Sequence, residues 1–499
     1  MLTATPSALC PAGLIRPLPR AERWILFGLL AFAFALRFVP ALLLPNLLWP
    51  DEIFQTLEQG HRLAFGYGIV PWEYVEGLRN WVVPGVIGIV MWLTQWMGPG
   101  STGYLAAVAA VLCAISLLPV YVAFRWSFAT FGRWPAIAAA VVVAGWFELI
   151  YFAPKAFFGA IAASILVYAM YRGSVARARA DAGAGTESDL SVRSNPLRNP
   201  WIVFGLLAGL AFALRLQLVL AVAALFFIYC RRDIRDAWIP SLLGAAAVVV
   251  VSGLVDWITW SYPFQSFWVA VDFNLIQGKS AQWGTKPAGW YASETIRNWL
   301  FAAIPVLAFA IVGLKHRWDL GVAAILAWAA VAVVAHKEYR FLFPFVVLVI
   351  VLSAIGVARL LAWIPEISRR RGTGDSKWLL PVAALVLCAL VYVGSWGLAS
   401  RYGKDEVGTL FWIYDREVLV AYSELSQQDI CEVVLVAENP GDDSWSWTGG
   451  YAYLHHDIAV NAVKDLPPEA ELEDAVVYKI GQSADAIRYV VGYRCEPAT

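Results

Sequence analysis

Residues 24–55 read WILFGLLAFAFALRFVPALLLPNLLWPDEIFQ, a long apolar run that ends abruptly at an acidic helix start. The run is long enough to cross about 30 Å of hydrocarbon as a helix. Basic residues precede it, and no small-residue cleavage site follows a short apolar core. We therefore expect a retained first membrane span at 24–46, after a cytoplasmic leader at 1–23.

The whole chain shares this apolar character. Its 499 residues are 60% hydrophobic and 15% charged, with a mean hydropathy of +0.63, whereas a soluble domain carries about 25% charged residues. Helices satisfy their own backbone in lipid, and the alternating pattern of barrel strands is absent. We predict an α-helical polytopic membrane protein of about eleven to thirteen crossings. Its candidate spans are 24–46, 81–97, 102–124, 134–152, 155–171, 200–230 (long enough to be a broken pair), 238–260, 297–314, 319–335, 341–363 and 378–399.

The distribution of basic residues predicts the orientation. Lys and Arg collect in the leader and at 172–199, 231–235, 315–317 and 368–371, which indicates the cytoplasmic side. The loops 47–80 and 261–296 and the C-terminal residues 400–499 then lie outside. The number of crossings counted forward from the leader differs by one from the number counted backward from 368–371, and the difference arises between 81 and 171. We therefore expect a half-length or re-entrant segment there. The stretch 172–199 is typical of a flexible cytoplasmic linker.

The C-terminal residues 400–499 form a separate compositional region. Charged residues, Asn, Gly and Pro return there, and CEVVLVAENP at 431–440 has the pattern of a strand that ends in a turn, which predicts a small α/β domain. Cys431 and Cys495 flank this region and would pair in an oxidising compartment, although two unrelated thiols are an equal alternative. The six cysteines show no paired metal-ligand spacing, so a zinc site is not expected. Because 37 basic residues balance 37 acidic ones, a nucleic-acid partner is not expected either.

The loop 47–80 carries the densest polar chemistry. Pro50 followed by two acids favours a helix start. Helical spacing puts one polar face on this helix, with apolar residues roughly opposite, and predicts that it lies along the membrane surface. Either this face is simply solvated, or it presents a carboxylate as a general base beside a membrane-embedded cavity. The polar face comprises Asp51, Gln55, Glu58 and Arg62, and Glu73, Glu76 and Arg79 further along either line the same site or pair with one another.

Other charges lie within or between the apolar runs. The segment HKEYRFLFP at 336–344 offers cations that either bind a phosphate or form a collar at the membrane interface. Arg37, Arg215 and Asp256 each lie inside an apolar run, where insertion costs on the order of 3 kcal/mol. They are therefore either functional or structural partners, with Asp256 paired to one of the arginines. Trp283, Trp290 and Tyr291 in the outer loop offer flat faces that stack on sugars or belong to an interfacial belt.

These segments together resemble glycosyltransferase family 22, the membrane mannosyltransferases of the GT-C superfamily that extend N-glycan precursors and GPI anchors. The acid pair followed by Gln is most similar to the branch that adds the third mannose to GPI. The resemblance spans about three hundred residues and leaves out the C-terminal hundred. It is carried by PDEIFQ at 50–55, FGYGIVPWEY at 65–74, RNW at 79–81, Asp256, the loop FN…GTKP…WY at 273–291 and HKEYRFLFP at 336–344.

The resemblance implies a GT-C bundle, with 24–399 as the catalytic domain, that uses a polyprenyl- or dolichyl-phosphate sugar. Transfer would invert the anomeric centre at the outer or lumenal face, to a glycan or glycolipid acceptor. It leaves the need for a divalent metal open. Asp51 would be the base, and Glu52 would position the acceptor or support Asp51. The leaving phosphate would meet His336, Lys337 and Arg340, with Arg37 or Arg215. The substrates would contact Gln55, Glu58, Trp72, Glu73, Arg79, Asp256, Asn274, Thr285 and Trp290.

Departures from the family pattern concern the acceptor side. Lys286 replaces an acid or His within GT-x-P, and Ala288 and Gly289 are inserted before Trp290. A transporter or lipid flippase is the competing interpretation, but it predicts two matching halves with polar groups at mid-membrane depth, and no halves match here. The Ala- and Trp-rich composition favours a bacterial inner membrane over the endoplasmic reticulum.

Overall fold

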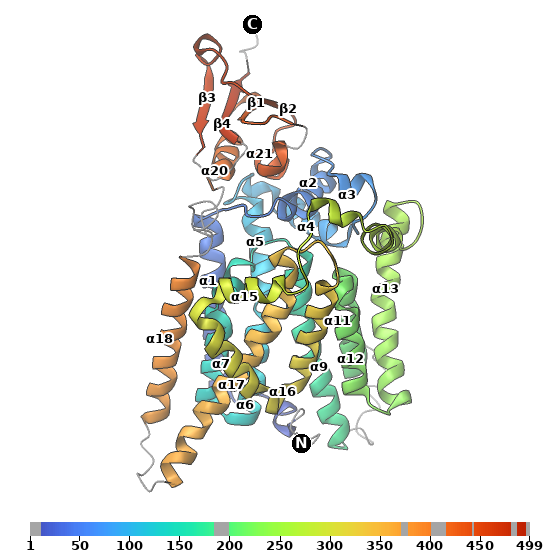
Figure 1. The fold of residues 1–499 in the computed structure, drawn as a ribbon, viewed down its shortest axis with the longest axis vertical. Helices are drawn as coiled ribbons and strands as arrows, with labels where there is room; N and C mark the ends of the chain where they lie inside the picture. The colour runs from blue at the N-terminus through green and yellow to red at the C-terminus, as the bar shows by residue number, and fades with distance from the viewer. Residues whose placement is uncertain are drawn as a thin grey trace.

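The computed structural model describes residues 11–183, 199–370, 378–400, 416–441, 444–480 and 487–495. Figure 1 shows a helical bundle with the N-terminus at one end and a small sheet domain at the other. The bundle helices are α1 (Arg20–Leu43), α4 (Val82–Thr94), α5 (Tyr104–Ile115), α6 (Leu118–Phe131), α7 (Arg133–Gly145), α8 (Phe147–Tyr151), α9 (Phe158–Asp181), α11 (Pro200–Leu214), α12 (Val219–Cys230), α13 (Ile239–Thr259), α16 (Ala303–Ala332), α17 (Phe343–Arg370) and α18 (Leu379–Ala399). This is a multi-pass membrane protein of the predicted α-helical class.

In the described residues, seven helical segments are long and apolar enough to cross a membrane, and four shorter apolar helices accompany them. We expected eleven to thirteen crossings. The difference arises because several predicted spans are broken or short helices. The predicted broken pair at 200–230 is confirmed: α11 ends at Leu214, Arg215 takes an extended conformation, and α12 begins at Val219. Likewise, α16 bends at Arg317, between the two spans predicted at 297–314 and 319–335.

The half-length segment expected between 81 and 171 is α4. Its 13 residues cover only about 20 Å at 1.5 Å per residue. Just before it, Asn80 donates to Asp256 near the end of α13 (2.6 Å). Just after it, the Tyr104 hydroxyl donates to the carbonyl of Ala452 in the sheet domain (2.7 Å). Both ends of α4 therefore lie at the same end of the bundle. Because α4 then adds no crossing, the numbers of crossings counted from the two ends of the chain agree.

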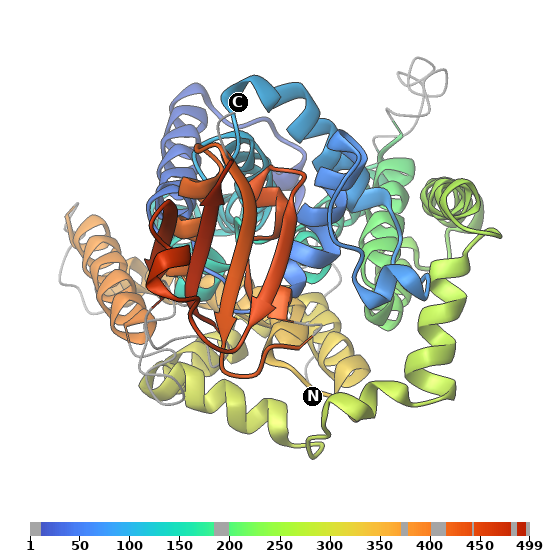
Figure 2. The ribbon, with the colours of Figure 1, turned by 90° about the horizontal axis from the view of Figure 1, so that it is seen from above.

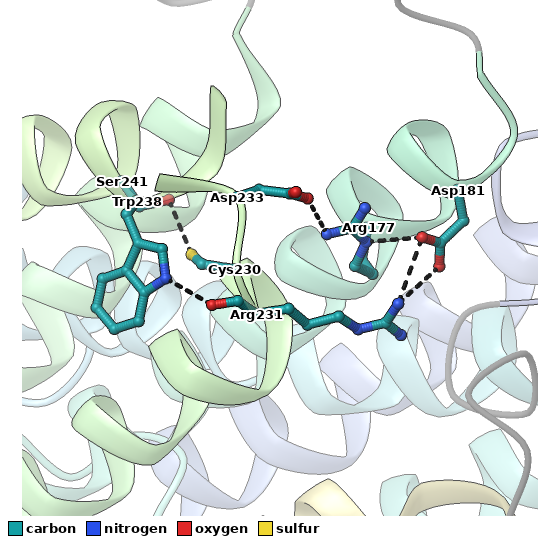
Figure 3. Close-up of polar contacts among 7 residues, drawn as sticks. All are labelled: Arg177, Asp181, Cys230, Arg231, Asp233, Trp238 and Ser241. Atoms are coloured by element: carbon teal, nitrogen blue, oxygen red, sulfur yellow. Dashed lines mark hydrogen bonds and ion pairs between the residues drawn. The ribbon is translucent and has the colours of Figure 1, made fainter. Parts of the chain in front are cut away.

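The end of the bundle near the N-terminus gathers basic residues into ion pairs (Figure 3). Arg177 of α9 pairs with Asp181 and with Asp233, and Arg231 reaches Asp181 from the end of α12. The prediction of a flexible linker at 172–199 is therefore wrong for its first part, because the residues up to Asp181 continue α9 and are held by these pairs. Residues 184–198 of that linker lie outside the described residues.

The opposite end of the bundle is covered by short helices from the two polar loops, as Figures 1 and 2 show. A π-helical turn, η3, occupies Ile53–Leu57 and leads directly into the next helix. A π turn holds one residue more than an α turn and is often found at functional sites. The covering helices are α2 (Glu58–Phe65), α3 (Trp72–Val75) and α14 (Gln265–Val271), whereas α15 (Trp290–Trp299) lies lower, along the side of the bundle in Figure 1.

The C-terminal domain is a four-stranded sheet in the order β2-β1-β4-β3, with only the β1–β2 pair parallel. The predicted strand at 431–440 is confirmed as the central β1. Cys431 and Cys495 form a disulfide between the start of β1 and the end of β4. In Figure 2 the sheet lies over the bundle. Its elements are α20 (Arg416–Leu425), β1 (Ile430–Ala437), α21 (Gly450–Leu454), β2 (Ala459–Val463), β3 (Ala475–Lys479) and β4 (Ile487–Arg494).

Candidate active site

Asp51 lies where the first polar loop meets the segment 336–344, although some 290 residues separate them in the chain. Its Oδ2 atom pairs with Arg340 Nη1 at 2.8 Å and accepts a hydrogen bond from Gln55 Nε2 at 2.6 Å. Both contacts use Oδ2, and among the described residues Oδ1 has no protein partner. The side chain is 28% exposed. Asp51 is thus a charge-paired carboxylate with one oxygen open.

Arg340 is itself held by the neighbouring motif residues. Glu338 Oε2 lies 2.7 Å from Arg340 Nε, and Glu338 Oε1 accepts from His336 Nε2 at 2.9 Å. The other His336 nitrogen lies 3.0 Å from the Gly284 carbonyl, so the ring makes both bonds only as the imidazolium. Burial by itself would raise the pKa of Glu338, but Arg340 and His336 hold it below its ordinary value. The motif therefore presents an ordered cation to Asp51.

Gln55 joins Asp51 to a second carboxylate. Its Nε2 also donates to Glu73 Oε1 at 2.7 Å, so one amide group bridges both acids. Burial raises the pKa of Glu73; Arg79 opposes that shift and the charge of Asp51 adds to it. Glu73 is buried, and the predicted pairing within 73–79 therefore takes the form of a charge interaction with Arg79 rather than an exposed surface pair.

Glu52 faces away from Asp51, into a different environment. Its Oε1 pairs with Lys155 Nζ at 2.8 Å, and both side chains are nearly inaccessible. Burial raises the pKa of Glu52, against the opposing effect of Lys155. Asn46 and Tyr453 join this pair in lining a small cavity of about 60 Å³. The adjacent acids of the PDE motif (Pro50-Asp51-Glu52) thus make their contacts on two opposite sides of one helix.

Two further arginines have no acidic group within ion-pair distance, although Arg79 still interacts with the charge of Glu73. Arg79 and Arg215 both line a cavity of about 140 Å³. The Nε atoms of both are buried without a hydrogen-bond partner, and no ion pair of the described residues includes either. Phe341 lies between Arg215 and Arg340, 5.1 and 5.3 Å from their guanidinium carbons. The break between α11 and α12 is what brings Arg215 to this cavity.

The remaining walls of this cavity contain two more predicted residues. Asp256 accepts from Asn80, and from the amide and hydroxyl of Ser266, so it pairs with neither Arg37 nor Arg215. Asn274 also lines the cavity and donates to the Ala270 carbonyl. The alternative in which Asp256 is the ion-pair partner of an intramembrane arginine is wrong.

An apolar groove adjoins the polar cavity and shares five of its lining residues, among them Asn80, Phe158 and Leu214. It lies between α11 and α13 and has a volume of about 250 Å³. Val251, on the α13 wall, is 57% exposed. The two together make one continuous recess, with cations at one end and hydrocarbon along the other.

An aromatic stack flanks the site on its outer side. The Trp72 and Trp283 rings are stacked, with centroids 4.8 Å apart, and Phe273 packs against both. The Trp283 centroid also lies 6.3 Å from that of His336, while Glu73 follows Trp72 directly. Trp72 and Trp283 remain 39% and 46% exposed.

Other predicted site residues lie apart from this group. Arg37 donates to the carbonyls of Ala33, Val143 and Ala144, tying α1 to the end of α7. Lys337 is buried and donates to the carbonyls of Val334 and Lys286. Thr285 is exposed on its loop, and Trp290 packs against the bundle core.

The prediction that Asp51, Gln55, Glu58 and Arg62 share one polar helix face is also wrong. The π turn after Asp51 breaks the regular helical spacing, and Glu58 points into the C-terminal domain, fully buried. Sequence reasoning also missed Lys155 and Glu148, which accepts from Trp146, Trp299 and Tyr339. Both are charges inside apolar runs, so the rule that singled out Arg37 and Arg215 would have found them. The described residues contain no group of three or more His, Cys, Asp or Glu that could hold a metal ion.

The chain is similar in sequence to known proteins. The family model of the Alg9-like mannosyltransferases matches residues 28–413. Mannosyltransferase APTG1 of Arabidopsis thaliana is 25% identical over 348 residues, covering 66% of this chain and 58% of that protein. GPI alpha-1,2-mannosyltransferase 3 of Homo sapiens is 23% identical over 350 residues, covering 67% and 58%. The chain therefore matches less than two thirds of the length of these relatives.

Solved structures share the fold. ArnT from Cupriavidus metallidurans bound to undecaprenyl phosphate superposes with a TM-score of 0.56 at 13% identity, covering 95% of this chain and 98% of that one. The apo form of the same protein gives a TM-score of 0.53 at 14% identity, with the same coverage. At this identity the likeness concerns the arrangement of the helices and of the C-terminal domain.

The Glu52–Lys155 pair gives a stability prediction. Replacing Lys155 by Met leaves a buried carboxylate unpaired, which should cost about 3 kcal/mol or more. The double variant Glu52→Gln/Lys155→Met should recover most of that loss. Thermal unfolding of both variants in detergent checks this. Equal stability of the single and double variants would contradict a mutually compensating pair.

Proposed function

Because the chain belongs to the Alg9-like mannosyltransferase family, we propose that it transfers a sugar, most simply mannose, from a polyprenyl- or dolichyl-phosphate donor to a glycan or glycolipid acceptor. The observation that carries the proposal is Asp51. This carboxylate is fixed through Oδ2 by Arg340 and Gln55 and is open at Oδ1. The Phe341 ring contacts both Arg340 and Arg215, which lines the neighbouring cavity.

The open oxygen suits Asp51 to act as a general base. In the proposed reaction the acceptor hydroxyl oxygen attacks the anomeric carbon of the donor, and its proton passes to Asp51 Oδ1. The bond between the anomeric carbon and the phosphate oxygen breaks, and polyprenyl phosphate leaves with the electron pair. Attack opposite the departing phosphate inverts the anomeric centre. Glu52 contributes by fixing the helix rather than by touching the acceptor.

Arg79 and Arg215 are the proposed ligands of the donor phosphate. Two guanidinium groups that line one cavity repel each other and form no ion pair among the described residues, so an anion in the cavity would stabilise both. Arg340 lies close enough to share the negative charge that develops as the phosphate departs. Arg37 and Lys337, which donate to backbone carbonyls, have no part in this assignment, and His336 acts on the phosphate only through Glu338 and Arg340.

The apolar groove between α11 and α13 is the proposed site of the prenyl chain. It is continuous with the cavity of Arg79 and Arg215, and its lining includes Leu206, Leu210 and Val248. A lipid phosphate bound with its head at the arginines would place its first prenyl units there and bury them against these side chains.

Acceptor binding is assigned to the aromatic stack. A half-exposed tryptophan face packs well against the C–H face of a sugar ring. This stack adjoins both arms of the Asp51 network, since Trp72 directly precedes Glu73 in the chain and Trp283 lies beside His336. Lys286 and the insertion at Ala288 and Gly289 lie on the adjoining loop, so acceptor choice is where this chain would differ from its relatives.

The distribution of charges supports an outer or lumenal active site. Helix α2, which follows Asp51, and the C-terminal domain lie at the end of the bundle opposite the N-terminus (Figure 1). The ion pairs of Figure 3 lie at the ends of α9 and α12, and basic ends face the cytoplasm. A disulfide at Cys431 and Cys495 suits an oxidising compartment. A bacterial inner membrane is proposed on composition alone, since the relatives named above are from a plant and from human.

The base assignment predicts that Asp51→Asn lowers kcat by about a thousandfold, because the amide cannot accept the proton. Transfer from a synthetic short-chain prenyl-phosphate mannose to an alkyl α-mannoside would be measured in detergent. Glu76→Gln, an exposed acid of the same loop, should keep wild-type activity. An Asp51→Asn variant with full turnover would refute the assignment.

The donor assignment predicts that Arg215→Gln raises the KM for the prenyl-phosphate sugar by about tenfold or more, since a hydrogen bond to a charged group contributes about 1.5–3 kcal/mol. The KM for the acceptor should stay within about twofold. Arg232→Gln, on the exposed basic end, serves as the control. A change confined to acceptor KM would show that the cavity holds something else.

The acceptor assignment predicts the reverse pattern for Trp283→Ala. Loss of one stacking face should raise the acceptor KM by roughly tenfold, given about 1.5 kcal/mol at most for such a contact, with donor KM unchanged. Trp96→Ala removes an exposed tryptophan outside the stack and should have little effect. Identical kinetics for the Trp283→Ala variant and the wild type would exclude the stack as the acceptor site.

A further inference from the structure

The C-terminal domain, most of which lies beyond the family match, holds the helix of Asp51 from its other side. Glu58 begins α2, two turns after Asp51, and its side chain is completely buried. Its Oε2 accepts from the Ala452 amide of α21 at 2.9 Å, and its Oε1 accepts from the Ile69 amide at 2.8 Å. One carboxylate therefore bonds the outer loop to the domain that covers it.

Gly450 is shaped for this contact. It has φ +57°, and a Cβ atom there would lie 2.6 Å from Glu58 Oε2 and 3.0 Å from the Phe54 ring. Only glycine lets the carboxylate come so close to the amides of α21. The close approach is consistent with a specific seat for Glu58 rather than with incidental packing.

Further contacts surround this seat on both sides. Tyr104 donates its hydroxyl proton to the Ala452 carbonyl at 2.7 Å. His61 Nε2 and His455 Nδ1 are 3.0 Å apart, and His61 Nδ1 lies 3.1 Å from the Tyr67 carbonyl. Since that carbonyl must accept, His61 Nε2 accepts from His455. The end of the Asp51 helix is thus clamped between the bundle and α21.

The π turn connects the contacts of Glu58 to the direction of the Asp51 side chain. It holds one extra residue between Asp51 and Glu58, and Gln59 donates to the Phe54 carbonyl within it at 2.8 Å. Conversion of the π turn to a regular α turn would rotate the preceding residues by about 100° about the helix axis relative to Glu58. Asp51 would then no longer point at Arg340.

We propose that Glu58 is a positioning residue: seated on the amide of Ala452 beside Gly450, it fixes the π turn so that Asp51 Oδ2 meets Arg340 and Oδ1 faces the substrates. The C-terminal domain is accordingly a working part of the site. The expected effect on kcat rests on the proposed transfer reaction. The expected effect on the structure of the π turn does not.

The test introduces a Cβ atom into the seat with Gly450→Ala. The expected result is faster hydrogen exchange of the amides at 51–58 and a fall in kcat of about a hundredfold, as for an ångström-scale misplacement of a reacting group. The KM values for a short prenyl-phosphate mannose and an alkyl α-mannoside should stay within about twofold. Gly66→Ala is the matched control: φ is +91° there, and a Cβ atom meets nothing within 4 Å.

A second variant covers the case in which Gly450→Ala fails to fold. Glu58→Gln keeps the side-chain size but turns one amide N–H toward another, so it should give the same kinetic pattern more weakly. Unchanged exchange at 51–58 in these variants would overturn the proposal whatever the activity, as would a lower melting temperature with full kcat. Absence of transfer by the wild type, with exchange altered as expected, would count against the proposed reaction instead.

Discussion

The cost of leaving a charge unpaired where water is scarce governs this structure. Arg37 meets three carbonyls, Glu52 meets Lys155, and Arg317 meets Asp319. Against these, Arg79 and Arg215 stand out in the described residues because they share a cavity with no acidic partner within ion-pair distance. This contrast supports the proposal that the two arginines bind the donor phosphate.

The PDE motif shows how one helix can serve two purposes. Asp51 and Glu52 are neighbours in sequence, so their side chains leave the helix in different directions. One joins the open network of Arg340, Gln55 and Glu73, while the other is sealed against Lys155. A single backbone segment thus carries an accessible carboxylate and, next to it, the ion pair that anchors it in the bundle.

Much of this could be predicted from sequence, because hydropathy and charge act locally. The helical class, the basic end, the break near Arg215 and a half-length segment somewhere between 81 and 171 all follow from such patterns. The expected eleven to thirteen crossings exceed the seven long apolar helices of the described residues. The direction of Glu58 could not be predicted, since it depends on a π turn and on a partner almost four hundred residues away. The partners of Arg37 and Asp256 were missed for a related reason: carbonyl, amide and hydroxyl groups satisfy a buried charge as well as an opposite charge does, and they leave no mark in composition.

The apolar groove between α11 and α13 has one further consequence. Val251 on its wall is exposed on a bundle helix, so the recess is open on the side where the bilayer lies. A lipid-linked donor could enter sideways, without leaving the hydrocarbon. Its encounter with the protein would then be a search in two dimensions, governed by the mole fraction of the donor among the surrounding lipids rather than by its concentration in any aqueous volume.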